Sequence, residues 1–379
     1  MKRLAPLLLT LVLLFGILAG CAASRQSPAS PVPAETAVPG TAAEEAAASE
    51  PPNLARLASV SDFFLLFLDV GQADSILVGC EGHYMLVDGG NVADSQRVVS
   101  VLKKYGVKQL DELVCTHGHE DHVGGLTGVL YSFPVREVLC PITHYNSDPF
   151  RNFRNAVKSA GLSLTRPMVD LEFSLGSASV KVLAPRRDNY EDPNDFSLVL
   201  KLTYGANTFL LTGDAERASE LDMVEDGCDL KSDVLKVGHH GSNSSTSYPF
   251  LNAVMPTWAV VSAGQNNDFG HPAEAPLSRL RDAQAALLRT DMQGDILCVS
   301  DGTAITFTPA RHPNAITNPT RMDGLGSNAA PGSYIGNLRT GVFHRATCPN
   351  LPAADNRAYF RYRTEAIVAG FRPCGVCTP

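Results

Sequence analysis

The sequence lacks an excess of positive charge and has only one long hydrophobic run. Its 379 residues carry a formal net charge of −8. Residues 331–379 carry +4 and residues 1–20 carry +2, so the remainder carries −14. A body this acidic repels a phosphate backbone over long range, so any work on nucleic acid would have to rely on bound metal or on the basic C-terminal segment.

The single hydrophobic run lies near the N-terminus. Lys2 and Arg3 precede the apolar segment 4–18, which predicts a secretory signal peptide over residues 1–20 rather than a spanning helix. The run ends in LAGC, which resembles a bacterial lipobox and implies cleavage before Cys21 and lipid attachment to its sulfur. An ordinary signal peptide or an uncleaved anchor is the alternative. In each case we expect the body outside the cytoplasm, and a lipid on Cys21 would also anchor it to the cell membrane. We expect no transport by this chain alone.

Two segments without a periodic apolar pattern divide the chain. Residues 21–57 are rich in Ala, Pro, Ser and Glu and predict a flexible tether. Gly, Pro, Asn and Ser dominate residues 311–333, which predict a second linker. We therefore expect one large body at residues 58–310 and a small module at residues 334–379.

Apolar runs bounded by turn residues predict two strand-rich blocks. The first block has strands at 63–70, 74–80, 83–90, 112–117 and 136–142, and the second at 174–185, 197–204, 207–214, 233–240, 258–264, 294–302 and 304–309. Helical patterns fall between them, at 94–105, 149–160 and 273–286. Two strand-rich halves interleaved with helices predict an α/β fold of two packed sheets covered by helices.

The stretch THGHEDHVGG packs three histidines and an aspartate into six positions: His117, His119, Asp121 and His122. It follows a predicted strand that ends at Thr116, so it forms a loop or the start of a helix. Imidazole and carboxylate are the ligands expected of zinc, or of manganese and iron. The loop therefore predicts two ligand sets for two neighbouring divalent metals.

This pattern resembles the signature of the metallo-β-lactamase superfamily. The resemblance implies an αββα metallo-β-lactamase sandwich with a site for two divalent metals, Zn²⁺ or Mn²⁺, at the edge of both sheets. Asp88, in LVDGG, matches an aspartate that supports the ligand loop without binding metal. Asp214, in LLTGD, matches the carboxylate that bridges the two metals.

Six ordered motifs narrow the resemblance. LDVGQADSILV, THGHEDHVGGL, NDFSLVL, LLTGDAE, DVLKVGHHGS and FGHP are similar to the metallo-hydrolase domain of the ComEC family of DNA-uptake proteins and its free-standing relatives. The similarity covers about residues 60–310. It implies a phosphodiester hydrolase that acts on DNA, and a DNA-uptake channel as a conjectural partner.

The sequence departs from the family pattern at two places. Many superfamily members place a metal-binding histidine about twenty residues before the bridging aspartate, where this chain has Asn194 and Asp195. Either one metal is weakly held or one of these residues substitutes, and hydrolysis of β-lactams is not expected. Ala73 replaces a glycine of the ComEC-like pattern, and an alanine is strained if that position needs a positive φ.

Three further histidines are candidates for the site. His239 ends an apolar strand, where the superfamily commonly supplies a ligand of the second metal. His240 and His271 could be ligands, general acids or phosphate contacts, and a hydrogen-bonded structural role is the alternative. We expect Asp121 and Asp214 to orient a water, and His240 or His271 to stabilise charge or protonate the leaving group. Ser242 is a weaker candidate for a phosphate contact.

The C-terminal module has the spacing of a closed structural zinc site, with His344-x3-Cys348 and Cys374-x2-Cys377. A domain this small needs such a staple. The alternative is a disulfide with a bystander cysteine. The remaining cysteines predict small buried apolar side chains, although a disulfide among them stays open: Cys80, Cys115, Cys140, Cys228 and Cys298.

The module resembles the metal-binding domain of the DNA-repair protein Ada. That family uses four cysteines, the first of which accepts a methyl group, and His344 stands at that first position. The resemblance therefore implies one structural Zn²⁺ and affinity for the DNA backbone, without methyl transfer. Four arginines are candidate phosphate contacts or a solvated face: Arg339, Arg345, Arg361 and Arg363.

Three hypotheses follow. The leading one is a lipid-anchored extracytoplasmic nuclease with DNA as its partner. The second keeps the fold but takes a small-molecule or envelope phosphodiester, which suits the acidic body. The third is a non-catalytic surface protein that binds DNA and has lost one metal.

Overall fold

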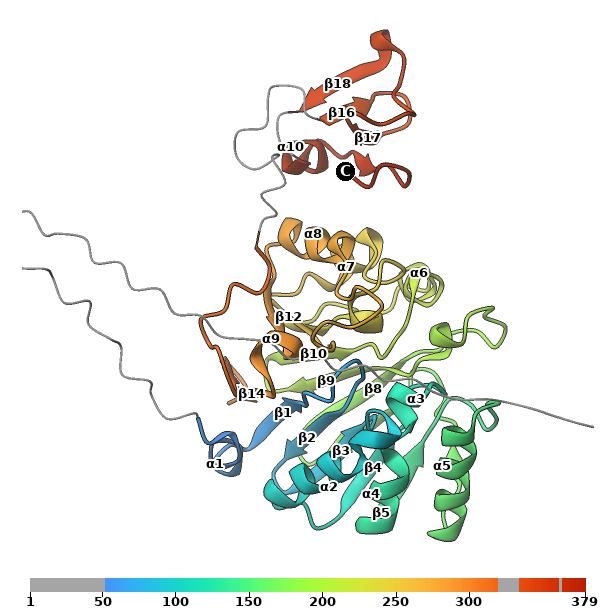
Figure 1. Cartoon of the computed structure of the whole chain (residues 1–379), viewed down its shortest axis with the longest axis vertical. Coiled ribbons are helices and arrows are strands. Elements are labelled where there is room, and N and C mark those ends of the chain that lie inside the picture. The colour runs from blue at the N-terminus through green and yellow to red at the C-terminus, as the bar shows by residue number, and fades with distance from the viewer. Residues whose placement is uncertain (1–51, 320–333, 361–362) are drawn as a thin grey trace, which may run out of the picture. The chain divides into compact units, whose positions relative to one another are not determined.

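The computed structural model describes residues 52–319, 334–360 and 363–379 (Figure 1). The predicted signal peptide, the lipidation site at Cys21, the tether as far as residue 51, residues 320–333 of the second linker and Arg361 lie outside the described residues. Among the helices of the described ranges, none has the length and apolar character needed to span a membrane.

The first sheet has eight strands in the order β15-β14-β1-β2-β3-β4-β5-β6. Its strands are β1 (Phe63–Phe67), β2 (Ile76–Cys80), β3 (His83–Val87), β4 (Leu110–Val114), β5 (Val135–Leu139), β6 (Leu164–Thr165), β14 (Ile296–Ser300) and β15 (Ile305–Pro309). Strands β3 to β6 run parallel to one another. Parallel strands need crossover connections, and helices supply them here.

The second sheet has seven strands in the order β13-β12-β11-β10-β9-β8-β7. Its strands are β7 (Glu172–Leu175), β8 (Ala178–Ala184), β9 (Val199–Tyr204), β10 (Asn207–Leu211), β11 (Val234–Lys236), β12 (Trp258–Val261) and β13 (Ala286–Arg289). Strands β10 to β13 are parallel. Each sheet therefore has a parallel half whose strands end at one edge.

The helices cover the outer faces of the two sheets. Figure 1 shows α2, α4 and α5 against the first sheet, and α6, α7 and α8 against the second. The helices of the body are α1 (Leu54–Ser59), α2 (Ser95–Lys104), α3 (Glu120–Val123), α4 (Leu126–Ser132), α5 (Asp148–Ser159), α6 (Arg217–Glu225), α7 (Tyr248–Val254), α8 (Glu274–Asp282) and α9 (Thr290–Gln293). These four layers confirm the predicted αββα sandwich.

Three clusters of buried apolar side chains fill the three spaces between the layers. Strand β1 shows how the sequence divides between them. Phe63, Leu65 and Phe67 join the cluster between the sheets. Phe64 and Leu66 join the cluster under α2 and α4, because alternate side chains of a strand point to opposite faces. A strand covered on both faces therefore reads as an unbroken apolar run, as FFLLF does.

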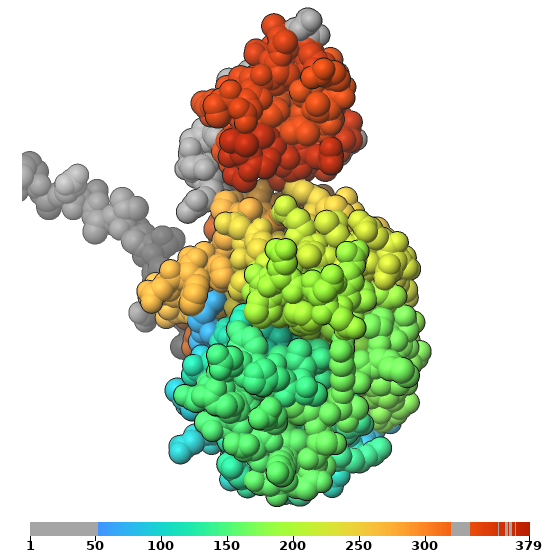
Figure 2. Space-filling view, turned by 90° about the vertical axis from the view of Figure 1, so that its right-hand side faces the viewer, coloured from blue at the N-terminus to red at the C-terminus, as the bar shows by residue number. Residues whose placement is uncertain are grey.

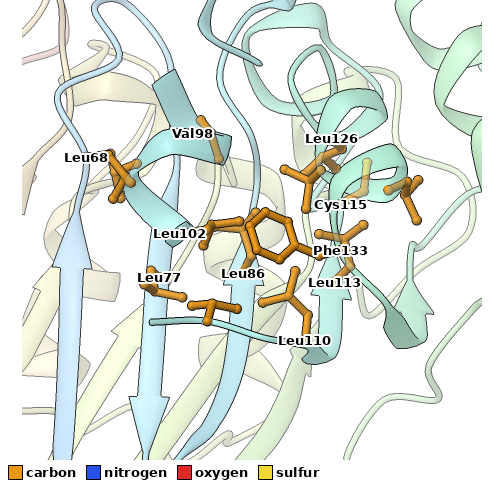
Figure 3. Packing of buried hydrophobic residues seen from close by; sticks show 14 of the residues in the cluster. Leu68, Leu77, Leu86, Val98, Leu102, Leu110, Leu113, Cys115, Leu126 and Phe133 are labelled. Carbon is orange, nitrogen blue, oxygen red and sulfur yellow. The ribbon is translucent and has the colours of Figure 1, made fainter. Parts of the chain in front are cut away.

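Figure 3 shows the outer cluster of the first sheet at close range. Leu102 of α2 lies beside Leu77 of β2 and Leu86 of β3, and Leu126 of α4 lies beside Cys115. In the space-filling view of Figure 2, side chains close the gaps that the ribbons leave between layers of the body. This packing holds the strand ends of the first sheet in place.

Several elements differ from the prediction. Helix α1 begins inside the predicted tether, and Thr317 and Asn318 of the predicted second linker are hydrogen-bonded to the body. No residue range was predicted for β6, α4, α6 or α7. The strand expected at 174–185 is a hairpin of β7 and β8, because Gly176 turns the chain with a φ of 57°. The helix expected at 273–286 ends at Asp282, and Ala286 already begins β13. Strand β13 was missed because its four residues carry little periodicity.

The C-terminal module forms a separate four-stranded sheet in the order β18-β16-β17-β19. Its elements are β16 (Tyr334–Asn337), β17 (Val342–Arg345), β18 (Arg357–Phe360), β19 (Arg372–Pro373) and α10 (Arg363–Val368). A sheet this small has little core of its own, since Phe343 is the one large side chain that it buries fully within the described residues.

Candidate metal centre

The candidate centre lies where strands of both sheets end. Asp88 follows β3, the ligand loop follows β4, Asp214 follows β10, and the pair His239 and His240 follows β11. The carboxyl ends of parallel strands meet at one edge of a sheet, which is the usual place for a ligand in open α/β sheets. The sandwich thus brings together residues more than 120 positions apart.

Asp88 holds the ligand loop from behind. It accepts hydrogen bonds from the backbone N–H of Thr116 at 2.8 Å and from the Thr116 hydroxyl at 2.7 Å. Its Oδ2 also lies 2.8 Å from Nδ1 of His122. This contact leaves Nε2 of His122 facing the centre, so Asp88 has the supporting geometry that the family resemblance implied. Burial raises the pKa of Asp88, and His122 and Thr116 oppose that shift.

Four side chains form a compact set of donors: Asp121, His122, Asp214 and His240. One donor atom from each lies within 4.8 Å of all the others. Nε2 of His122 lies 3.2 Å from Oδ2 of Asp214, and Nε2 of His240 lies 3.2 Å from Oδ2 of Asp121. Two imidazoles and two carboxylates are a donor set that suits zinc or manganese.

Two buried atoms of this set test whether a metal fits. Nε2 of His122 and Oδ1 of Asp214 are both buried, and neither makes a hydrogen bond to any described residue. Leaving such polar atoms without a partner costs free energy, and a cation bound between them removes that cost. Although burial opposes ionisation, the neighbouring histidines hold the pKa values of Asp121 and Asp214 below their usual range. Both carboxylates are therefore ready to bind a cation.

His117 and His119 lie beside this set. Nε2 of His117 is 3.0 Å from Nδ1 of His119 and 3.9 Å from Oδ2 of Asp214. The two histidines do not join the 4.8 Å groups found among the described residues. Asp214 faces both ligand sets, which is the position of a bridging carboxylate.

His240, not His239, completes the compact set. Nδ1 of His240 lies 3.0 Å from the carbonyl oxygen of Ser262, which turns Nε2 toward Asp121 and Asp214. His239 instead places Nδ1 at 2.7 Å from Glu216. Sequence order alone could not show which of two adjacent histidines faces which ligands.

His271 lies at the rim of the centre. Its ring lies 5.5 Å from that of His239, and its Nδ1 lies 3.3 Å from Nε2 of Gln72. Burial, with His239 and His240 nearby, lowers the pKa of His271 to about 4. A neutral imidazole at pH 7 does not suit the expected role of general acid. Ser242 is engaged with the Ser244 hydroxyl at 2.8 Å.

Asp195 does not supply a ligand in this geometry, whereas Oδ1 of Asn194 is buried and makes no hydrogen bond to a described residue. Asp195 accepts the backbone N–H groups of Glu216 and Ser219 at 3.1 and 3.0 Å, so it caps the start of α6. Asn194 donates its side-chain N–H to Glu216 at 3.3 Å. The substitution proposed for Asp195 is thus at odds with its contacts.

Two expectations about the surrounding chain can be compared with the structure: strain at Ala73, and a disulfide among the scattered cysteines. Ala73 is buried without a positive φ, so the strain expected from replacing glycine is absent. The eight cysteines in the described ranges all carry free thiols, and Cys80, Cys115, Cys140 and Cys298 are buried. These four buried cysteines serve as small apolar side chains, and Cys115 also donates to the His117 carbonyl oxygen.

Sequence reasoning missed a buried ion pair beside the centre. Nζ of Lys236 lies 2.7 Å from Oδ2 of Asp74, and both side chains are almost fully buried. Asp74 also approaches Nδ1 of His240, at 3.5 Å. The signal was present in the sequence as a lysine inside the apolar run DVLKVG, where burial requires a partner.

The module brings His344, Cys348, Cys374 and Cys377 within 4.8 Å of one another. The sulfur of Cys374 accepts the backbone N–H of Val376, and that of Cys377 accepts the N–H of Arg345, each at 3.4 Å. Hydrogen bonds to sulfur lower the pKa of Cys374 although burial opposes them. Three thiols and one imidazole in this arrangement fit a closed zinc site.

The fold and the site together define a metal-dependent hydrolase. A model of the metallo-beta-lactamase superfamily matches residues 68–264, and the chain belongs to that superfamily. A model of the metal binding domain of Ada matches residues 327–379. These matches confirm the expected cofactor classes, divalent metals in the body and zinc in the module.

Relatives narrow the similarity to ComEC-like proteins. ComE operon protein 3 of Bacillus subtilis is 30% identical over 247 residues, which are 60% of this chain and 32% of that protein. Competence protein ComA of Neisseria gonorrhoeae is 37% identical over 228 residues, 60% of this chain and 30% of that protein. Recombination protein 2 of Haemophilus influenzae is 29% identical over 235 residues, which are 60% of this chain and 28% of that protein. The chain thus spans about a third of the length of these curated relatives.

Solved structures resemble the body more remotely. The metallo-beta-lactamase fold protein YhfI from Bacillus subtilis is 12% identical, with a TM-score of 0.42, over 65% of this chain and 100% of that chain. A likeness at this level carries no argument about function.

Proposed function

We propose that the chain is an extracytoplasmic metal-dependent phosphodiester hydrolase that cleaves DNA in DNA processing or uptake. The observation that carries the proposal is the compact set Asp121, His122, Asp214 and His240 at the strand ends of a metallo-β-lactamase sandwich. Relatives named for competence and recombination support DNA as the substrate class.

The residues of the site suit attack on a phosphodiester. Divalent metals bound here would supply Lewis acidity, which polarises a phosphoryl oxygen and makes water more acidic. Asp121, whose side chain is 29% exposed, can accept a hydrogen bond from an incoming water. His271, neutral at the rim, can donate a hydrogen bond to a phosphate oxygen. The carbonyl oxygen of Ser262 orients the His240 ring, and Nε2 of His240 in turn orients the carboxylate of Asp121 at 3.2 Å.

The acidic body makes the module the better source of DNA affinity. Arg339 is exposed on the turn after β16. Arg345 donates to the Thr378 carbonyl oxygen at 3.2 Å, and Arg363 donates to that of Pro379 at 2.6 Å. Arg339 is therefore our first choice for a phosphate contact, since it makes no side-chain hydrogen bond to a described residue.

The purified chain, supplied with Mn²⁺ or Zn²⁺, should degrade single- or double-stranded DNA. Asp214→Ala should abolish the cleavage, because this side chain faces both ligand sets. Asp188→Ala is the matched control, since that carboxylate is exposed and distant in sequence from the ligand loop. Absence of cleavage of every nucleic acid under these conditions contradicts the proposal.

A small-molecule or envelope phosphodiester is the second candidate. The charge of −14 outside the two basic end segments favours it, because a short substrate is repelled less than a polymer. Hydrolysis of bis-p-nitrophenyl phosphate without DNA cleavage would support this candidate. DNA binding with fewer than two metals in the body would instead support a non-catalytic DNA-binding protein.

We further propose that a lipid on Cys21 holds the body outside the cell membrane. The basic residues, the apolar run and LAGC support this location. Radiolabelled palmitate should enter the wild-type chain and not Cys21→Ala, which should appear in the soluble fraction. Capture of a DNA-uptake channel with the anchored chain would support that channel as a partner.

A further inference from the structure

His117 and His119 do not by themselves supply enough ligands for a metal ion. The sequence assigned these two imidazoles and the shared carboxylate of Asp214 to that metal, with Asn194 or Asp195 as a possible substitute for a third histidine. A catalytic zinc commonly takes three protein ligands and keeps one open position, and a bridging carboxylate is divided between two metals. Asn194, at the position where a third histidine was expected, donates its side-chain N–H to Glu216, which leaves only Oδ1 free, an oxygen donor that suits zinc less well than an imidazole nitrogen.

His239 offers a third nitrogen from a different element. Its Nδ1–H donates to Oε1 of Glu216 at 2.7 Å, which places the lone pair on Nε2. That Nε2 lies 3.8 Å from Oδ2 of Asp214. The same oxygen lies 3.9 Å from Nε2 of His117. Both nitrogens therefore approach one oxygen of Asp214. Zinc–ligand bonds of about 2.0–2.1 Å separate tetrahedral ligands by about 3.3 Å. Side-chain rotations would have to bring His117, His119 and His239 together, because none of the three belongs to a group within 4.8 Å among the described residues.

Glu216 is built to hold His239 in this orientation. Besides His239, its Oε1 accepts the Ser244 hydroxyl at 2.7 Å and the Asn194 side-chain N–H at 3.3 Å. A ligand histidine typically donates its other ring N–H to a carboxylate, which fixes the tautomer and the ring direction. Asn194, which stands where the third histidine was expected, therefore holds the carboxylate of Glu216, and Glu216 in turn holds His239.

The backbone supplies an independent observation. His239 and His240 have φ values of 46° and 51°, the left-handed region that few residues other than glycine adopt. Two consecutive residues in this region cost about 1–3 kcal/mol each, and such costs persist where a site requires them. The turn lets neighbouring side chains face the same centre. His240 reaches Asp121, and His239 reaches Asp214 from the side of Glu216.

We propose that His239 is the third imidazole ligand of the metal bound by His117 and His119, with Glu216 and Asn194 as positioning residues. The expected third histidine is thus supplied by the turn after β11 rather than by the segment before β9. The assignment concerns metal binding alone, so it holds for DNA and for any other substrate of the body.

Binding of Co²⁺ alone tests the proposal without any substrate. The metal-free chain is dialysed against Co²⁺, bound metal is counted, and the visible spectrum is followed through a titration. Wild type should bind three ions, two in the body and one in the module. His239→Ala should bind one fewer at the same free Co²⁺, whereas the exposed His144→Ala should match wild type.

Two further variants separate a ligand from a structural histidine. Glu216→Gln keeps the size of the side chain and should weaken one body ion by about 10–100-fold. Adding Asn194→His to His239→Ala should restore that ion, because it supplies an imidazole from the segment where one was expected. Fluorescence of Trp258, the only tryptophan, checks that the body of each variant is folded.

Equal counts and affinities for folded His239→Ala and His144→Ala would overturn the proposal, as would a wild-type body that binds one ion. Unchanged Co²⁺ affinity in Glu216→Gln would overturn the positioning role. A chain that loses an ion with His239 but cleaves no DNA would leave this assignment standing and remove the DNA proposal.

Discussion

Removing one partner of the buried pair Lys236 and Asp74 should strongly destabilise the body. Nζ of Lys236 lies 2.7 Å from Oδ2 of Asp74 and donates to the Val237 carbonyl oxygen at 2.9 Å. The Lys236 side chain is 0% exposed and that of Asp74 is 2% exposed. Because Oδ1 of Asp74 makes no hydrogen bond to a described residue, the lysine is the main compensation for this buried charge.

Lys236→Met removes the charge and keeps the apolar stem. It leaves the Asp74 carboxylate buried without its counter-ion, a change that costs about 3–5 kcal/mol. A folded domain has about 5–15 kcal/mol in total, so the loss should be plain in a urea titration. The double variant Lys236→Met with Asp74→Asn leaves no uncompensated charge. We expect it to be at least about 2 kcal/mol more stable than the sum of the single changes predicts.

The single tryptophan makes the assay specific. Trp258 lies in β12 and packs on Phe307 with ring centroids 5.1 Å apart, so its fluorescence follows unfolding of the body and not of the module. A chelator in every sample removes any stabilisation by metal at the nearby His240. Arg136→Met is the control, because its ion pair with Asp111 is exposed and is worth under about 1 kcal/mol. If Lys236→Met costs no more than this control, the buried pair does not act as argued.

Three further outcomes are expected. Burial raises the pKa of Glu220 to about 7 from 4.5, so the folded state retains a proton that the unfolded state loses. At 1.36 kcal/mol per pKa unit, its contribution of about 3 kcal/mol is present below pH 4.5 and lost by pH 7. Urea titrations of Glu220→Gln should lack that part of the fall, and an unchanged pH profile would contradict the shift. Cys348→Ser should bind one zinc fewer per chain by elemental analysis, and a full count would exclude its sulfur as a ligand. Gly125→Ala would press its new methyl group into the Gly89 carbonyl. It should cost about 1–3 kcal/mol in the Trp258 assay, and a wild-type midpoint would refute the contact.

Local sequence was enough for the fold class and for most of the donor set. The unbroken apolar runs reflect strands covered on both faces, and three histidines with an aspartate in six positions are informative without any partner in space. Asp88 and Asp214 were found because they stand at strand ends in a familiar order. Strand β13 escaped notice, since a four-residue edge strand leaves too few positions for a pattern.

Contacts between distant segments decided the rest. Nothing in Asn194, Glu216 and His239 as separate letters shows that they form one hydrogen-bonded group, because they meet only when α6 and the turn after β11 pack together. The same holds for Lys236 in β11 and Asp74 in the loop before β2, which are 162 positions apart.

The sequence by itself determined which chemistry this chain can hold, because ligand atoms and apolar periodicity are properties of single residues and short windows. Only the tertiary structure decided which nitrogen faces which oxygen. His239 and His240 are neighbours in the chain, yet a left-handed turn sends one to Glu216 and Asp214 and the other to Asp121. Side-chain direction depends on backbone dihedrals and on the groups packed around them, and adjacent letters do not record either.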